Sequence, residues 1–219
     1  MKNSDLGSRP GSKFQYSNIG YWLLGKLIQN ISGKKYAIYV TENIFKPLSL
    51  TPNEIGFLII DENNHAKGYL KKWSFLNLFG RFLIDRSMLG DYEGSWLHIK
   101  NVYVNGPSFG GAIGSAKAFS RILQDLLSER SKLLEEETKQ LLYSQQKTDS
   151  DNKINMTLGC HIDKLKGINY YYKEGGGAGF HSELRIYPEK GLASVIMTNR
   201  TSFNSRRSLS ELDINFIAN

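Results

Sequence analysis

The spacing of apolar residues changes along this chain of 219 residues, and that change sets the kind of fold that it can adopt. In several segments of roughly the first two thirds, apolar side chains recur every three or four positions, which is typical of helices with one buried face. From Phe180 to Tyr187 the period becomes two, which is typical of a half-buried strand. Helices followed by neighbouring strands predict an α+β fold rather than a repeating βαβ arrangement.

The first helix is predicted to start after Asn18 and to end at Gly33, a residue suited to a helix C-cap. We expect its buried face to contain apolar residues four positions apart, namely Ile19, Leu23, Leu27 and Ile31. A second helix is predicted over about 35–45, since Pro47 cannot continue it.

Two more helices are predicted in the middle of the chain. Ser115 is suited to the N-cap of one, and the other should begin near Ser131. Residues 147–153 are polar and predict a surface loop. A strand is then expected over 168–172, followed by a hairpin in which a turn at 188–191 joins the strands 180–187 and 192–198.

Two short stretches carry residues suited to acyl transfer. Tyr16 and Asn18 lie in Pro-Gly-Ser-Lys-Phe-Gln-Tyr-Ser-Asn-Ile-Gly-Tyr, directly before the first predicted helix. Lys173 opens Lys-Glu-Gly-Gly-Gly-Ala-Gly-Phe near the end of the chain. In that stretch Gly175 and Gly176 have no Cβ to obstruct a substrate that approaches the backbone.

In this order, the two stretches resemble two of the three signatures of the serine β-lactamase and penicillin-binding-protein superfamily, in the branch of class C β-lactamases, D,D-peptidases and esterases. The likeness extends to 106–111 and 180–199 and is weakest over about 53–104. It implies one partial domain of β-lactamase/transpeptidase-like fold over 1–219. A mainly helical lobe would occupy about 19–145, and antiparallel strands with the start of a terminal helix would occupy about 155–219.

The resemblance also implies roles for five residues. Tyr16 would move the proton of an attacking serine, and Lys173 would favour the phenolate and attract anionic substrate. Asn18 would hydrogen-bond the amide arm of the substrate. Gly175 and Gly176 would line the same cleft, and the Gly176 N–H would form half of an oxyanion hole.

The third signature of the family, a Ser-x-x-Lys helix that carries the nucleophile, belongs upstream of Tyr16, where this sequence has fifteen residues. Ser-x-x-Lys does occur three times later, beginning at Ser32, Ser144 and Ser150. The chemistry requires both side chains on one helical face, one turn apart. Gly33 interrupts the first copy, the second falls at a helix end, and the third lies in the polar loop. We therefore predict that none of them is the nucleophile.

Three other features bear on chemistry. Tyr103 begins a second Tyr-x-Asn but lacks the residues that flank the first. Glu174 stands where the family commonly has a small hydroxyl residue, which argues against penicillin-like substrates. The four histidines have no metal-ligand spacing, and we expect His181 to be a surface residue of its strand. No metal and no cofactor is expected.

Composition limits the classes of partner. The net charge of +7 comes from scattered basic residues, so a solvated surface is favoured over nucleic-acid binding. Neither a signal peptide nor a transmembrane run is evident, and the cellular compartment stays open. The lone Cys160 forbids an internal disulfide. The basic, aromatic segment 71–79 could meet a membrane surface, but a wall over the cleft or core packing is favoured.

The function predicted for the family is acyl-enzyme hydrolysis of an amide, lactam or ester in a small molecule or peptide with a reactive carbonyl. We expect no acylation by this polypeptide alone, because its nucleophile segment is missing. The alternative is a non-catalytic protein that binds peptide or cell-wall fragments in the same cleft. Loss of earlier strands would also leave a sheet edge open to self-association.

Overall fold

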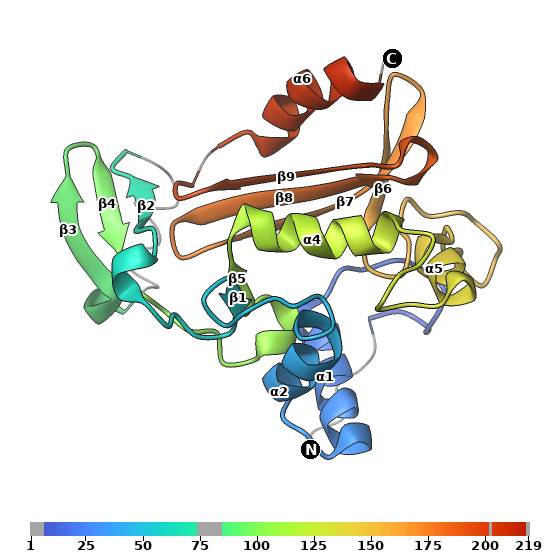
Figure 1. Ribbon diagram of the computed structural model, residues 1–219, viewed down its shortest axis with the longest axis horizontal. Coiled ribbons are helices and arrows are strands. Elements are labelled where there is room, and N and C mark those ends of the chain that lie inside the picture. The colour runs from blue at the N-terminus through green and yellow to red at the C-terminus, as the bar shows by residue number, and fades with distance from the viewer. Residues whose placement is uncertain (1–6, 74–84, 202, 218–219) are drawn as a thin grey trace.

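A four-stranded antiparallel sheet organises the computed structural model, which describes residues 7–73, 85–201 and 203–217. Its order is β6-β7-β8-β9, formed by His161–Leu165, Ile168–Gly177, Phe180–Tyr187 and Leu192–Thr198. Helices α4 (Ala116–Leu127) and α6 (Ser205–Ile217) cover opposite faces of this sheet (Figure 1). The α+β prediction, with helices first and an antiparallel sheet later, is confirmed.

The predicted hairpin forms where the sequence indicated. The turn after β8 is the 3-10 helix η5 (Pro188–Lys190), and Gly191 closes it with φ of 60°, a conformation that glycine adopts without steric cost. Strand β7 is longer than expected, because it continues through the glycine motif to Gly177. Lys173 therefore pairs with Leu184, and Gly176 pairs with His181.

Local sequence chemistry fixes both ends of helix α1 (Asn18–Ser32). The hydroxyl of Ser17 accepts a hydrogen bond of 3.2 Å from the backbone N–H of Gly20. At the other end Gly33 has φ of 68°, and its N–H donates to the carbonyl of Gln29. The predicted boundaries of this helix are confirmed.

The prediction for the buried face of α1 is wrong. Its four members are largely exposed: Ile19 by 70%, Leu23 by 55%, Leu27 by 52% and Ile31 by 78%. The helix instead packs through another side, where Gly25 is buried against the 3-10 helix η4 (Pro107–Phe109). The apolar face therefore has no cover within the described residues.

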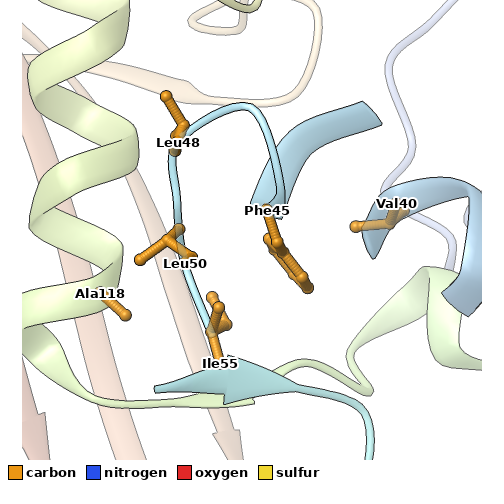
Figure 2. Packing of buried hydrophobic residues seen from close by; sticks show 6 residues of the cluster. All are labelled: Val40, Phe45, Leu48, Leu50, Ile55 and Ala118. Atoms are coloured by element: carbon orange, nitrogen blue, oxygen red, sulfur yellow. The ribbon is translucent and has the colours of Figure 1, made fainter. Parts of the chain in front are cut away.

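The core of the helical lobe is shared by α2, the segment that follows it and α4. Helix α2 (Tyr36–Val40) continues as the π-helix η1 (Thr41–Phe45), over the range predicted for a single helix. A pair of short strands, β1 (Ile55–Gly56) and β5 (Ile113–Gly114), closes the lobe. Figure 2 shows the buried cluster that these elements share, made of Val40, Phe45, Leu48, Leu50, Ile55 and Ala118.

The lobe is less helical than the sequence predicted. The strands β2 (Gly68–Lys71), β4 (Trp96–Ile99) and β3 (Leu89–Glu93) form, in this order, a three-stranded antiparallel sheet. Short 3-10 helices lie before it and within it, at η2 (Glu62–Asn64) and η3 (Arg86–Met88). Of the aromatic segment at 71–79, residues 74–79 lie outside the described residues. Trp73 is 83% exposed and therefore does not pack in the core.

One of the two helix starts predicted in the middle of the chain is confirmed, and the other differs. Helix α4 is capped by Ser115 as predicted, with the hydroxyl accepting from the N–H of Ala118. Helix α5 (Glu136–Tyr143), however, begins after Ser131 rather than at it. The Asp125 carboxylate accepts hydrogen bonds from the Ser131 hydroxyl at 2.6 Å and from the Lys132 N–H at 2.8 Å, and these bonds hold that stretch as a loop.

A buried polar network joins β8 to α6. The Arg185 guanidinium lies 2.6 Å from the Glu183 carboxylate, and both side chains are fully buried. Asp213 of α6 accepts a hydrogen bond of 2.8 Å from the Tyr187 hydroxyl. His181 belongs to the same face, with Nε2 2.9 Å from the Ser205 hydroxyl oxygen, so the expectation of a surface histidine is wrong.

Candidate active site

The structure brings the first sequence motif and the glycine motif together. The Lys173 Nζ lies 4.4 Å from the centroid of the Tyr16 ring, although the two residues are 157 positions apart. The same ammonium lies 5.9 Å from the centroid of the Tyr21 ring. A cation over the face of an aromatic ring is attracted by the electrons of the ring, so these contacts hold the Lys173 head group in place.

The loop before α1 sets the position of the tyrosine. Because Ser17 caps the helix, Tyr16 lies just before the cap and Asn18 is the first helical residue. The Tyr16 hydroxyl donates a hydrogen bond of 2.9 Å to the Asn18 Oδ1. Tyr16, Asn18 and Lys173, which the resemblance grouped, therefore form one cluster.

Tyr21 is a member of this cluster that the sequence analysis did not assign. Its ring centroid lies 5.8 Å from that of Tyr16, one turn along the start of α1. Burial is the main cause that raises the Tyr21 pKa, and the nearby Tyr16 and Cys160 add to it. Tyr21 does lie in the same sequence motif as Tyr16, but only the tertiary contact shows that it reaches Lys173.

The charge of Lys173 acts on two side chains at the start of the neighbouring strand, Cys160 just before β6 and His161 as its first residue. Burial raises the pKa of the Cys160 thiol, and the positive charge of Lys173 partly opposes that effect. Burial lowers the pKa of His161, and Lys173 lowers it further. A positive charge favours anions and disfavours other cations, so this corner of the sheet is suited to a negatively charged group.

Gly175 and Gly176 follow Lys173 on β7 and are exposed. Side chains alternate along a strand, so position 175 faces the same side as Lys173 and position 176 faces the α6 side with His181. An added Cβ at Gly176 would lie 3.5 Å from the His181 Nδ1. The strand then turns through Ala178, which has φ of 50°.

None of the three Ser-x-x-Lys copies has the geometry that a nucleophilic serine of this kind needs. Ser32 is the last residue of α1, and its hydroxyl donates to the carbonyl of Ile28, while Lys35 lies beyond the helix. Ser144 follows α5. Ser150 lies in the loop, where its hydroxyl accepts from Asn152. No copy places serine and lysine one turn apart on one helix.

The second Tyr-x-Asn, which begins at Tyr103, lies outside the cluster of Tyr16, Asn18 and Lys173. The Tyr103 hydroxyl accepts a hydrogen bond from the backbone N–H of Ile59 at 3.4 Å.

A surface cavity of about 270 Å³ also lies away from the candidate site, next to the β2-β4-β3 sheet, and is lined by Tyr69, Glu93, Trp96, Asn199 and Arg200. In the part of the chain that the structure describes, no group of three or more His, Cys, Asp or Glu side chains could hold a metal ion. No helix there has the length and apolar character of a membrane span.

Comparison with known sequences shows the family. The family model described as Beta-lactamase matches residues 1–217. Protein flp of Staphylococcus aureus (strain NCTC 8325 / PS 47) is 37% identical over 69 residues, which are 32% of this chain and 14% of that protein. The putative D-alanyl-D-alanine carboxypeptidase of Escherichia coli (strain K12) is 41% identical over 51 residues, which are 23% of this chain and 12% of that protein.

Solved structures share the fold. The octameric penicillin-binding protein homologue from Pyrococcus abyssi has a TM-score of 0.76 at 20% identity, over 96% of this chain and 44% of that one. The D-amino acid amidase from Ochrobactrum anthropi, in complex with L-phenylalanine, has a TM-score of 0.72 at 18% identity, over 96% of this chain and 60% of that one.

This chain thus spans less than two thirds of the length of each of these relatives. The structural matches run through both the helical lobe and the four-stranded sheet, since they cover 96% of the chain. The β-lactamase/transpeptidase-like fold expected from the sequence is confirmed, and the relatives include hydrolases of amide bonds by name. The chain belongs to the beta-lactamase family.

Proposed function

We propose that this chain supplies the proton-transfer and substrate-binding half of a serine hydrolase that cleaves an amide, lactam or ester through an acyl-enzyme. The observation that carries the proposal is the meeting of Tyr16 and Lys173, with 4.4 Å between the ammonium and the ring centroid. The family match over 1–217 supports the same chemistry. On its own the chain is expected to be inactive.

The proposed reaction uses the cluster in two steps. A serine hydroxyl, supplied from outside the described residues, attacks the substrate carbonyl while its proton passes to the Tyr16 oxygen. Tyr16 then returns that proton to the leaving amine or alcohol as the bond to the carbonyl carbon breaks. Water later attacks the acyl-enzyme by the same route. Positioned proton transfer of this kind contributes roughly 10²–10⁴-fold to the rate.

Lys173 and Asn18 would assist that proton transfer in different ways. The Lys173 ammonium, held against the Tyr16 ring, would attract negatively charged groups of the substrate and of the transition state. In the resting site the Tyr16 hydroxyl donates to Asn18, so the phenol is already held in one orientation. Asn18 would also bind the amide arm of the substrate.

The glycine strand would hold the carbonyl oxygen. The exposed backbone at Gly175 and Gly176 lets a substrate lie against β7, and the Gly176 N–H would stabilise the developing negative charge. Glu174 pairs with Glu183 and so belongs to the α6 side of the sheet, opposite Lys173. A carboxylate at position 174 supplies no hydroxyl to a substrate carboxylate, so amides and esters are proposed ahead of penicillin-like lactams.

Steady-state hydrolysis by the gene product that contains this chain, including any segment encoded upstream, tests the proposal. The substrates are a p-nitrophenyl ester, an amino-acid p-nitroanilide and a chromogenic cephalosporin. Tyr16→Phe and Lys173→Met should each lower kcat by roughly 100-fold or more, because each removes a participant in proton transfer.

The second Tyr-x-Asn provides a matched control. Tyr103→Phe should leave kcat within about twofold of the original value, because Tyr103 lies outside the cluster. Full activity in Tyr16→Phe would contradict the proposal. Specific peptide binding without turnover of any substrate class would favour the non-catalytic alternative.

A further inference from the structure

The surface cavity beside the three-stranded sheet β2-β4-β3 is built from residues that the candidate active site does not use. Its lining comes from that sheet and from the end of β9, and none of the lining residues belongs to the Tyr16 and Lys173 cluster. Its volume of about 270 Å³ is somewhat smaller than the roughly 300–1,000 Å³ of pockets for drug-sized molecules. The cavity therefore has room for a small organic molecule.

Backbone hydrogen bonds fix the walls of this cavity where the three-stranded sheet lies beside one end of the large sheet (Figure 1). The Tyr69 N–H donates to the carbonyls of Gly179 and Asn199, at 3.1 Å and 3.0 Å. The Thr201 N–H in turn donates to the Tyr69 carbonyl at 3.0 Å. Glycine is needed at 179, because an added Cβ would lie 2.3 Å from the Tyr69 nitrogen. A ligand thus meets a preformed site, which lowers the ordering cost of binding.

Arg200 brings into this cavity a guanidinium that aromatic rings hold in place. Its Cζ lies 5.8 Å from the centroid of the Trp96 ring and 5.3 Å from that of the Phe203 ring. Among the residues that the structure describes, no side chain forms a hydrogen bond or an ion pair with this guanidinium. A guanidinium held over rings keeps the N–H groups at its edge available, and two of these match the two oxygens of a carboxylate.

The carboxylate that lines the cavity already has its donors. Glu93 accepts a hydrogen bond of 2.8 Å from the Lys67 Nζ on one oxygen and one of 2.7 Å from the Tyr69 hydroxyl on the other. Lys67 offsets the charge of Glu93, so the positive charge of Arg200 is left for a ligand. A second negative charge on that ligand would be repelled by Glu93, which favours a singly charged anion.

Trp96 and Tyr69 add apolar surface beside this charge. Leu70 and Leu97 follow them on the paired strands β2 and β4 and are buried, so Tyr69 and Trp96 extend from the opposite face of the three-stranded sheet. We propose that the cavity binds a small organic monocarboxylate, with its carboxylate on the Arg200 guanidinium and an apolar or aromatic group against the Trp96 ring. This binding site goes beyond the proposed hydrolysis and does not depend on it.

Calorimetric titration of residues 1–219 with two matched ligands tests the role of the charge. Hydrocinnamate has a phenyl ring and a carboxylate, whereas hydrocinnamyl alcohol has the same ring and carbon chain without a charge. We expect hydrocinnamate to bind with a Kd of about 1 mM or tighter and the alcohol to bind at least about 10-fold more weakly, because it cannot form charge-assisted hydrogen bonds. Equal affinities, or no binding of hydrocinnamate, would overturn the inference.

Substitution of Arg200 tests which cation is used. Arg200→Gln should weaken hydrocinnamate binding by at least about 10-fold, and Arg200→Lys should have a smaller effect, because it keeps the charge but loses the planar fork. Arg130→Gln is the matched control, since Arg130 is another exposed arginine and does not line the cavity. It should leave the affinity unchanged. An unchanged affinity in Arg200→Gln, with the fold intact by circular dichroism, would contradict the proposed site.

NMR of the tryptophan indole N–H groups locates the ligand in the unsubstituted protein. Hydrocinnamate should shift the Trp96 signal, which Trp96→Phe identifies, and should leave the signal of Trp22 on α1 in place. Lys173 is the cation of the candidate active site, and Lys173→Met should not change this binding. Binding that is lost in Lys173→Met, with no shift of the Trp96 signal, would place the carboxylate in the candidate active site and overturn the inference.

Discussion

At the scale of single residues, the site depends on how two aromatic rings hold one ammonium. The rings of Tyr16 and Tyr21 both contact the Lys173 ammonium. A cation held against aromatic rings in this way does not need a carboxylate to pair with. The resemblance of the two motifs was sufficient to predict that Tyr16 and Lys173 share a site. It could not predict Tyr21, because the distance from Tyr21 to a strand far along the chain depends on how α1 is placed on the sheet.

Tyr143 gives a residue-scale prediction about stability. Its hydroxyl is buried and has no hydrogen-bond partner in the described structure. An unsatisfied buried polar group costs about 1–3 kcal/mol. Tyr143→Phe should therefore raise the free energy of unfolding at pH 7 by about 1 kcal/mol in urea titrations, and an unchanged or lower value would contradict this account.

The same residue predicts a pH dependence. Burial raises the Tyr143 pKa to about 12, above the ordinary value for tyrosine. As pH rises, the unfolded chain loses this proton first, so the folded state loses relative stability between about pH 10 and pH 12. In Tyr143→Phe the alkaline loss of stability should be shallower than in the parent. Equal slopes in both proteins would count against a buried, neutral Tyr143.

At the scale of elements, local chemistry determines where helices and strands begin and end, and partners determine which faces are buried. Gly33 was sufficient to predict the C-terminal end of α1, because a cap is a contact between near neighbours. The buried face of α1 was predicted wrongly because burial depends on what packs against it. The β2-β4-β3 sheet was missed because its strands have four or five residues, too few to show a clear period.

The contact of α1 with η4 leads to a prediction about two glycines of one helix. Gly25→Ala should lower the free energy of unfolding by about 1–3 kcal/mol, because its Cβ would meet the Ser108 side chain at 2.3–2.4 Å. At Gly20 the nearest atom would be 3.8 Å away, so Gly20→Ala should be neutral or stabilising by up to about 1 kcal/mol. Chemical denaturation of both variants measures the difference, and equal effects would show that α1 does not pack on η4 as described.

The network between β8 and α6 leads to a second prediction at this scale. Arg185→Met leaves the buried carboxylates of Glu183 and Asp213 without their cation, and breaking a buried pair in this way costs about 3–5 kcal/mol. Arg207→Met removes an exposed ion pair with Glu211 and should leave the free energy of unfolding nearly unchanged, because solvent screens such pairs. Urea titrations in which the two variants match would show that the network does not hold α6 to the sheet.

At the scale of the whole molecule, the described chain leaves one apolar helix face and one sheet edge uncovered. Among the described residues β9 pairs on one side only, with β8, and the α1 face is bare. An open strand edge invites pairing with another chain, so self-association through β9 remains a prediction. The sequence motifs identified the family, but the extent of uncovered surface could be learned only from the three-dimensional arrangement.

The central claim is that Tyr16 of the first motif and Lys173 of the glycine strand share one site in residues 1–219. Proton NMR of the Lys173 side chain tests it directly, because the face of an aromatic ring shifts protons above it upfield. We expect the Lys173 ε-methylene signal to lie upfield of free lysine, to lose most of that shift in Tyr16→Leu and to keep it in Tyr103→Leu. A Lys173 signal that is the same in the parent and in Tyr16→Leu would show that the two groups are apart and would contradict the account.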